Sequence, residues 1–80
     1  MAKQSYKDKN GTTRVGDALR WLVARGKDVA PEILDIAANI TGIESLNKLS
    51  DKIKSDWQLS EADKQMLLAE LEFDVIEMQE

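Results

Sequence analysis

The sequence predicts an all-α fold: a small bundle of about four helices with a flexible basic N-terminal arm and a long C-terminal amphipathic helix. Apolar residues recur at helical spacing from residue 13 onward, and no segment shows the strict alternation of a half-buried strand. A length of 80 residues leaves room for a single hydrophobic core. We therefore expect an arm over residues 1–11 and one helical domain over residues 12–80.

The first helix of this domain is expected at about residues 13–25. Its apolar face has the helical spacing of Val15, Ala18, Leu19, Leu22 and Val23. Gly26 follows it and suits the left-handed conformation that ends a helix. The preceding arm contains one aromatic residue and no periodic apolar pattern, so we expect it to be unpacked and mobile.

Two further helices are expected between residues 31 and 54. Pro31 suits a first helical turn, and Gly42 can end the helix that Pro31 starts, at about Thr41. Apolar residues cover most of the circumference of this helix, which is typical of the central element of a core. The next helix, about Glu44 to Lys54, has one apolar stripe and is expected at the surface.

The C-terminal helix begins after Ser60, whose hydroxyl can accept hydrogen bonds from the first free amides. Its first apolar stripe consists of Ala62, Met66, Ala69, Phe73 and Ile76, and its second stripe consists of Leu68, Leu71, Val75 and Met78. Three short helices can cover one stripe well, and an open one usually marks an interaction site. We therefore predict a partner interface on this helix, and an oligomer or a component of a larger assembly. The remaining acids are interpreted as a solvated face: Glu70, Glu72, Asp74, Glu77 and Glu80.

Charge is distributed unevenly around a formal net charge of -4. Residues 1–27 hold seven Lys and Arg against two acids, whereas residues 28–80 hold four against thirteen. The candidates for contact with anionic lipid or nucleic acid phosphates are Lys3, Lys7, Lys9, Arg14, Arg20 and Arg25. A solvated basic surface that binds no ligand explains them better. Nucleic acid is disfavoured because the acidic half repels phosphate, and the segment 38–43 is interpreted as a helix corner rather than a DNA-reading turn.

The chain contains no cysteine and no histidine. This composition removes thiolate metal sites, cysteine nucleophiles and the usual general base. We expect a protein that is not an enzyme and that binds no cofactor or metal. Trp21 and Trp57 are expected to serve as core or interface anchors, because a tryptophan side chain buries a large area.

Two segments resemble a known family: Lys9 to Arg20, KNGTTRVGDALR, and Leu59 to Glu80, LSEADKQMLLAELEFDVIEMQE. They are similar to the N-terminal soluble part of small holin-like proteins of bacteriophages of Bacteroidetes. The resemblance implies a phage origin and transfers no site residue. Such proteins continue into hydrophobic spans, which this sequence lacks, so pore formation by this chain is not implied.

The expected function is that of a phage-encoded helical assembly protein, either holin-associated or a small virion component, that acts through its C-terminal helix on itself or on other phage proteins. The alternative is a small nucleic-acid-binding or regulatory protein that uses the basic N-terminal region. The longest stretch free of charge, residues 36–43, is far shorter than the roughly 20 residues that span a bilayer. The polar first ten residues do not resemble a secretory signal. We expect the protein in the host cytoplasm, at the inner face of the membrane, or in the virion.

Overall fold

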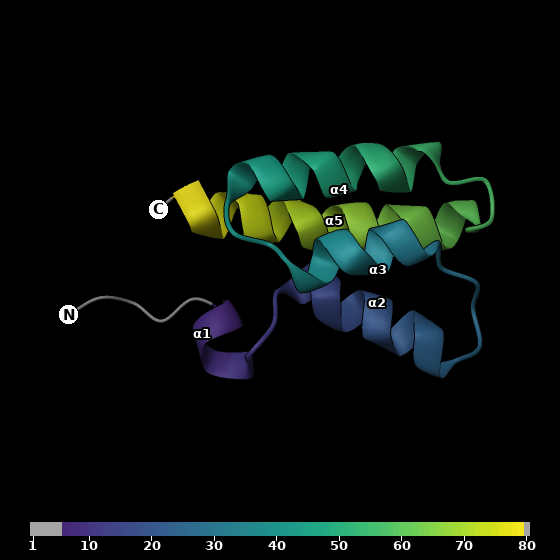
Figure 1. Cartoon of the computed structure of the whole chain (residues 1–80), viewed down its shortest axis with the longest axis horizontal. Helices are drawn as coiled ribbons and strands as arrows, with labels where there is room; N and C mark the ends of the chain where they lie inside the picture. The colour runs from purple at the N-terminus through teal and green to yellow at the C-terminus, as the bar shows by residue number, and fades with distance from the viewer. Residues whose placement is uncertain (1–5, 80) are drawn as a thin grey trace.

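The computed structural model describes residues 6–79 and folds this range into five helices without a strand (Figure 1). They are α1 (Tyr6–Asn10), α2 (Arg14–Ala24), α3 (Pro31–Ala38), α4 (Ile43–Ser55) and α5 (Glu61–Gln79). The predicted all-α class is confirmed, with five helices in place of about four. Residues 1–5 and 80, and with them the assignments made for Lys3 and Glu80, lie outside the described residues.

Helix α2 begins and ends where its sequence predicts. Thr13 is the N-cap, and its hydroxyl accepts a hydrogen bond from the Gly16 amide at 3.1 Å. Gly26 has a φ of 81°, in the left-handed region that glycine adopts without strain. The cap and this glycine therefore define the two ends of α2.

Helix α3 is shorter than predicted and ends by a different device. Pro31 occupies its first turn as expected, but the helix stops at Ala38 and the Asn39 amide donates to the Ile36 carbonyl. Gly42 has a φ of 173°, which is extended backbone, so the left-handed ending predicted for it was wrong. The chain leaves the helix early and buries the side chain of Ile40 in the core.

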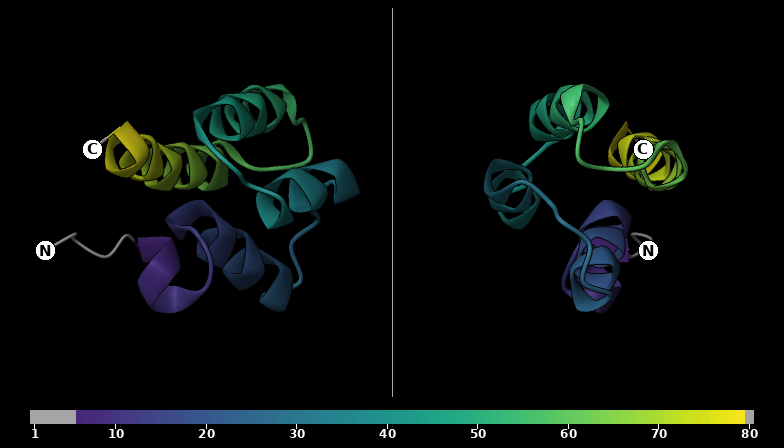
Figure 2. Two further views of the ribbon diagram at one scale, coloured as in Figure 1. Left: turned by 60° about the vertical axis from the view of Figure 1, so that its left-hand side comes forward. Right: turned by 90° about the vertical axis from the view of Figure 1, so that its right-hand side faces the viewer.

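Helix α5 is one of four helices around the core, and none of the described helices occupies the central place that the sequence assigned to residues 31–41. It packs along both α2 and α4, and the end-on view in Figure 2 shows the four longer helices around a common centre. Of α3, only Ile33 is fully buried. The central position predicted for α3 was wrong, because α3 packs against α2 and α4 as one of four helices around the core. Apolar content shows which residues avoid water and does not show how many helices surround them. The core consists of Val15, Leu19, Leu22, Ile33, Ile40, Leu46, Leu49, Ile53, Leu59, Leu67 and Leu71.

The unpacked arm expected over residues 1–11 is wrong for its second half, because residues 6–10 form α1 and contact the rest of the chain. The Tyr6 hydroxyl donates to the Asp17 carboxylate, and the Lys7 ammonium donates to the Ile40 carbonyl at 2.9 Å. These contacts are polar and come from distant parts of the chain, so apolar periodicity does not reveal them. The mobility of the arm stays a prediction.

None of the helices within residues 6–79 combines the length and the apolar character needed to cross a bilayer.

Leu67 tests the packing of α5 against the core. Its side chain is fully buried, whereas that of Leu68 is half-buried. We expect Leu67→Ala to lower the free energy of unfolding by about 2–5 kcal/mol, the range for truncating a buried leucine. Urea denaturation followed by circular dichroism measures this loss, with Leu68→Ala as the control that loses less. Equal losses for the two variants would contradict the packing described.

Candidate interaction surface

The α5 helix carries apolar side chains on two opposite sides. Its inner side presents Leu67 and Leu71 to the core, while Phe73 and Ile76 are 58% and 50% exposed. The structure therefore separates the eight residues predicted as interface. The second stripe, Leu68, Leu71, Val75 and Met78, packs into the core of its own chain. The first stripe lies at the surface at Ala62, Ala69, Phe73 and Ile76, which are exposed, whereas Met66 is half-buried and also packs against the core.

Helices α2 and α5 run antiparallel, because the start of one meets the last turns of the other. The backbone amides of Arg14 and Val15 donate to the Asp74 carboxylate at 3.0 and 2.9 Å. Beyond the opposite end of α2, the Lys27 ammonium lies 3.8 Å from the Asp63 carboxylate. This pairing fixes which residues of α2 stand beside each turn of α5.

Trp21 extends the exposed stripe of α5 onto α2. Arg14 contacts the ring of Phe73, with its guanidinium carbon 5.8 Å from the ring centre. Trp21 lies two turns after Arg14 in α2, and Met66 lies two turns before Phe73 in α5. The antiparallel pairing therefore brings Trp21, which is 50% exposed, level with Met66. We call the combined surface the outer face; it comprises Trp21, Ala62, Met66, Ala69, Phe73 and Ile76.

The sequence predicted Trp21 as a core or interface anchor and left the choice between the two open, although a signal for the outward position existed. The inward positions of α2 are Val15, Leu19 and Leu22, and Trp21 lies well to one side of that stripe. Trp57, also predicted to be a core or interface anchor, is 85% exposed in the connection between α4 and α5. Neither tryptophan belongs to the core.

Asp74 is buried, although the sequence placed it on a solvated acidic face. It is 3% exposed, and its two carboxylate oxygens accept hydrogen bonds from the first two backbone amides of α2. The Thr13 hydroxyl accepts a hydrogen bond from the third amide, that of Gly16. These first amides of the helix have no carbonyl partner within it, and all three are therefore satisfied. The sequence contained a signal for this burial, because Leu71, Asp74 and Met78 are spaced to share one side of a helix.

The environment of Asp74 acts on its pKa in two directions. Burial raises the pKa of this carboxyl, and the amides of Val15 and Arg14 lower it by binding the charged form. Burial has the larger effect, so the pKa stands above the ordinary value for aspartate.

The predicted anionic contacts are not gathered into one basic surface. Arg14 lies between the rings of Tyr6, at 4.6 Å, and Phe73, and its Nε is 3.7 Å from the Glu77 carboxylate. The Tyr6 backbone amide donates to the same Glu77, and the hydrogen bond to Asp17 raises the pKa of Tyr6. The Lys7 ammonium is held by a backbone carbonyl. The remaining described cations of that set, Lys9, Arg20 and Arg25, are exposed.

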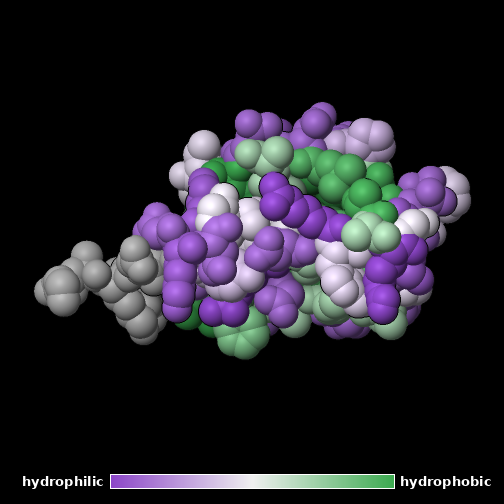
Figure 3. Space-filling view, turned by 90° about the horizontal axis from the view of Figure 1, so that it is seen from below, coloured by the Kyte–Doolittle hydropathy of each residue, from purple (hydrophilic) through white to green (hydrophobic). Residues whose placement is uncertain are grey.

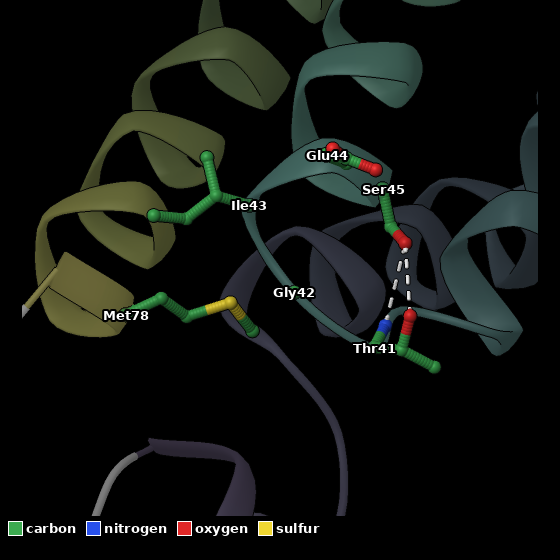
Figure 4. Close-up of a pocket in the computed structure, with 6 residues that line it drawn as sticks. All are labelled: Thr41, Gly42, Ile43, Glu44, Ser45 and Met78. Atoms are coloured by element: carbon green, nitrogen blue, oxygen red, sulfur yellow. Dashed lines mark hydrogen bonds between the residues drawn. The ribbon is translucent and has the colours of Figure 1, made fainter.

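A hollow lies where the turn between α3 and α4 meets the end of α5. Figure 4 shows Met78 extending from α5 toward this turn, and Ser45 beside Thr41, whose backbone amide donates to the Ser45 hydroxyl at 3.4 Å. Glu44 is the one acid in its lining. The hollow therefore offers no pair of titratable groups for acid–base chemistry. Within residues 6–79 no group of three or more acidic side chains could hold a metal ion.

The distribution of hydropathy over the surface shows two apolar groups of different size. Seen from below in Figure 3, hydrophobic residues gather along the margin formed by α3, and a smaller group appears at the opposite margin, beside the C-terminal half of α5. Charged side chains occupy the band between them.

Comparison of the chain with family models, with curated proteins and with solved structures gives no match.

We predict that Asp74→Ala lowers the free energy of unfolding by about 3 kcal/mol, because it leaves buried amides without an acceptor. The free energy of unfolding of Asp74→Asn should lie between those of the parent chain and Asp74→Ala, since an asparagine side chain has one acceptor oxygen where aspartate has two. The exposed Glu72, two residues earlier in α5, provides the control Glu72→Ala. Urea denaturation measures all four proteins. Equal stability of Asp74→Ala and Glu72→Ala would contradict a structural role for the buried carboxylate.

Titration of Asp74 followed by carbon NMR should give a midpoint above the usual value of about 3.9. The raised pKa means that the folded chain holds this proton to a higher pH than the unfolded chain does. The contribution of this carboxyl to the free energy of unfolding is therefore largest below the unfolded-state pKa and falls as pH rises through the folded-state pKa. A midpoint at or below the usual value would show that the two amides outweigh burial.

Proposed function

We propose that this chain is a non-enzymatic helical protein that works by assembly, and that its outer face is the surface on which another protein chain docks. The observation that carries the proposal is the exposure of Phe73 and Ile76 on a helix whose opposite side already supplies the core. Large apolar side chains gathered on one surface usually mark an interaction site. A composition without histidine or cysteine supports a binding role over a catalytic one.

In this proposal the four longer helices form a bundle, and α5 is amphipathic toward the core on one side and toward a partner on the other. The resemblance of residues 9–20 and 59–80 to the soluble part of phage holin-like proteins supplies a context. We propose a component of a phage assembly, beside a holin or within the virion. Proteomic analysis of purified particles distinguishes these two places.

Phe73 tests the proposal, because a glutamate at this position places a charge in the middle of the outer face. We expect the parent chain to sediment above its monomer mass of 9.0 kDa at micromolar concentration. Phe73→Glu should sediment as a monomer and keep its helical circular dichroism spectrum, since Phe73 lies outside the core.

Trp57→Glu is the matched control. It removes an even more exposed aromatic residue, which lies in the connection before α5 and outside the outer face. This variant should associate as the parent does. A parent chain that stays monomeric at every concentration, or equal dissociation of the two variants, would contradict the proposal.

A further inference from the structure

The outer face is bordered by opposite charges on its two long sides. Arg14 of α2 and Arg25, the residue that caps the end of α2, lie along one side, which we call the basic edge. Arg14 is already 3.7 Å from Glu77 of its own chain, so the exposed Arg25 supplies most of the positive charge of this edge. Arg14 contacts Phe73, and the Arg25 guanidinium stacks 4.3 Å from the centre of the Trp21 ring. Helix geometry places Glu61 and Glu72 on the far side of α5 from α2. Both glutamates are exposed, and we call them the acidic edge.

The charges of the two edges have the same spacing and stand at the same levels. Arg14 and Arg25 are eleven residues apart, and so are Glu61 and Glu72, a separation of about 16 Å along either helix. Arg14 is level with the Phe73 turn, which is also the turn of Glu72. Eleven residues after Arg14 comes Arg25, and eleven residues before Glu72 comes Glu61. Because α2 and α5 are antiparallel, Arg25 is therefore level with the turn of Glu61.

We infer that the occupant of the outer face is a second copy of this chain, related by a two-fold axis that runs along α5, so that the two α5 helices lie parallel. This inference rests on the proposed function and names the partner of the same surface. A two-fold interface is formed by the same patch on both copies. With the axis along α5, the basic edge of each copy lies opposite the acidic edge of the other. Arg25 then faces Glu61 of the second copy. Arg14, which Glu77 of its own chain already partners, lies at the level of Glu72 of the second copy.

The antiparallel arrangement of two copies is disfavoured by the same charges. A two-fold axis across α5 places each edge opposite its own counterpart, so that arginines meet arginines and glutamates meet glutamates. Like charges placed opposite each other at an interface are repulsive and exclude wrong arrangements. The charge pattern therefore selects the parallel pair.

The apolar side chains of the outer face suit a close parallel pair. They follow the alternating spacing of four and three residues that keeps one stripe facing a partner helix. The alanines at 62 and 69 let the two backbones approach, while Met66 and Phe73 fill the space between them. Trp21 of each copy covers the side of this seam and widens the buried area beyond that of α5 alone.

Single cysteines distinguish the two arrangements, and the cysteine-free chain makes them unambiguous. In the parallel pair each seam position meets itself, so Ala62→Cys, Ala69→Cys and Ile76→Cys should each form a disulfide-linked dimer in a glutathione buffer. Such bonds require Cα atoms about 4.4–6.8 Å apart. Asn47→Cys on the exposed side of α4 is the control and should stay unlinked.

A charge exchange within one chain tests the edges separately. Arg25→Glu or Glu61→Arg alone should raise the dissociation constant of the dimer about tenfold, because both copies then carry like charges at that level. The double variant restores opposite charges and should recover the affinity of the parent. Sedimentation equilibrium at low salt measures all four proteins.

Each result decides the arrangement. Three linked dimers together with recovery in the double variant support the parallel pair. Linkage of Ala69→Cys alone, with Ala62→Cys joining to Ile76→Cys in a mixture, shows the antiparallel pair and overturns this inference. Absence of linkage at all three positions in a chain that self-associates also overturns it. In both cases the comparison of Phe73→Glu with Trp57→Glu still decides the proposed function.

Discussion

The carboxylate of Asp74 holds the first turn of α2 against the last turns of α5, and much of the remaining structure depends on this contact. It satisfies two amides that would otherwise be unpaired, and its charge lies at the positive end of the α2 dipole. Burial of a carboxylate is costly, so the hydrogen bonds to Arg14 and Val15 are what make its place in the core tolerable. The antiparallel alignment of α2 and α5 follows from where this residue lies in α5.

That alignment also determines what the outside of the molecule presents. The same turn that directs Asp74 inward directs its neighbour Phe73 outward, next to Arg14. Two turns away, Trp21 and Met66 come to the same level. The four longer helices surround one core, so α5 turns one side to that core and the other to solvent. An apolar residue there adds nothing to the core of its own chain, and this is the observation on which the proposed partner rests.

The positions of the helices in the sequence were predictable from local signals, whereas the contacts between helices were not. Pro31, Gly26 and the Ser60 cap mark helix ends through effects that act within a few residues. Helix α1 escaped prediction because its contacts reach residues far along the chain. The division of the α5 stripes into an inner and an outer one also required the fold, since both have helical spacing. Asp74 was misjudged because a charged residue was taken as solvated, although it shares a side with Leu71 and Met78.

The uneven charge of the sequence acquires a different meaning in the folded chain. Read along the sequence, a basic beginning and an acidic remainder suggested contact with lipid or nucleic acid. In the fold, Arg14 and Lys27 lie beside acids of α5, which lowers the free positive charge of the N-terminal region. The cations and acids that remain at the rims of the outer face are separated by an apolar stripe. Arg25 on one rim and Glu61 and Glu72 on the other are exposed, so the two sides of the outer face differ in charge and a docking chain would meet them in one orientation only.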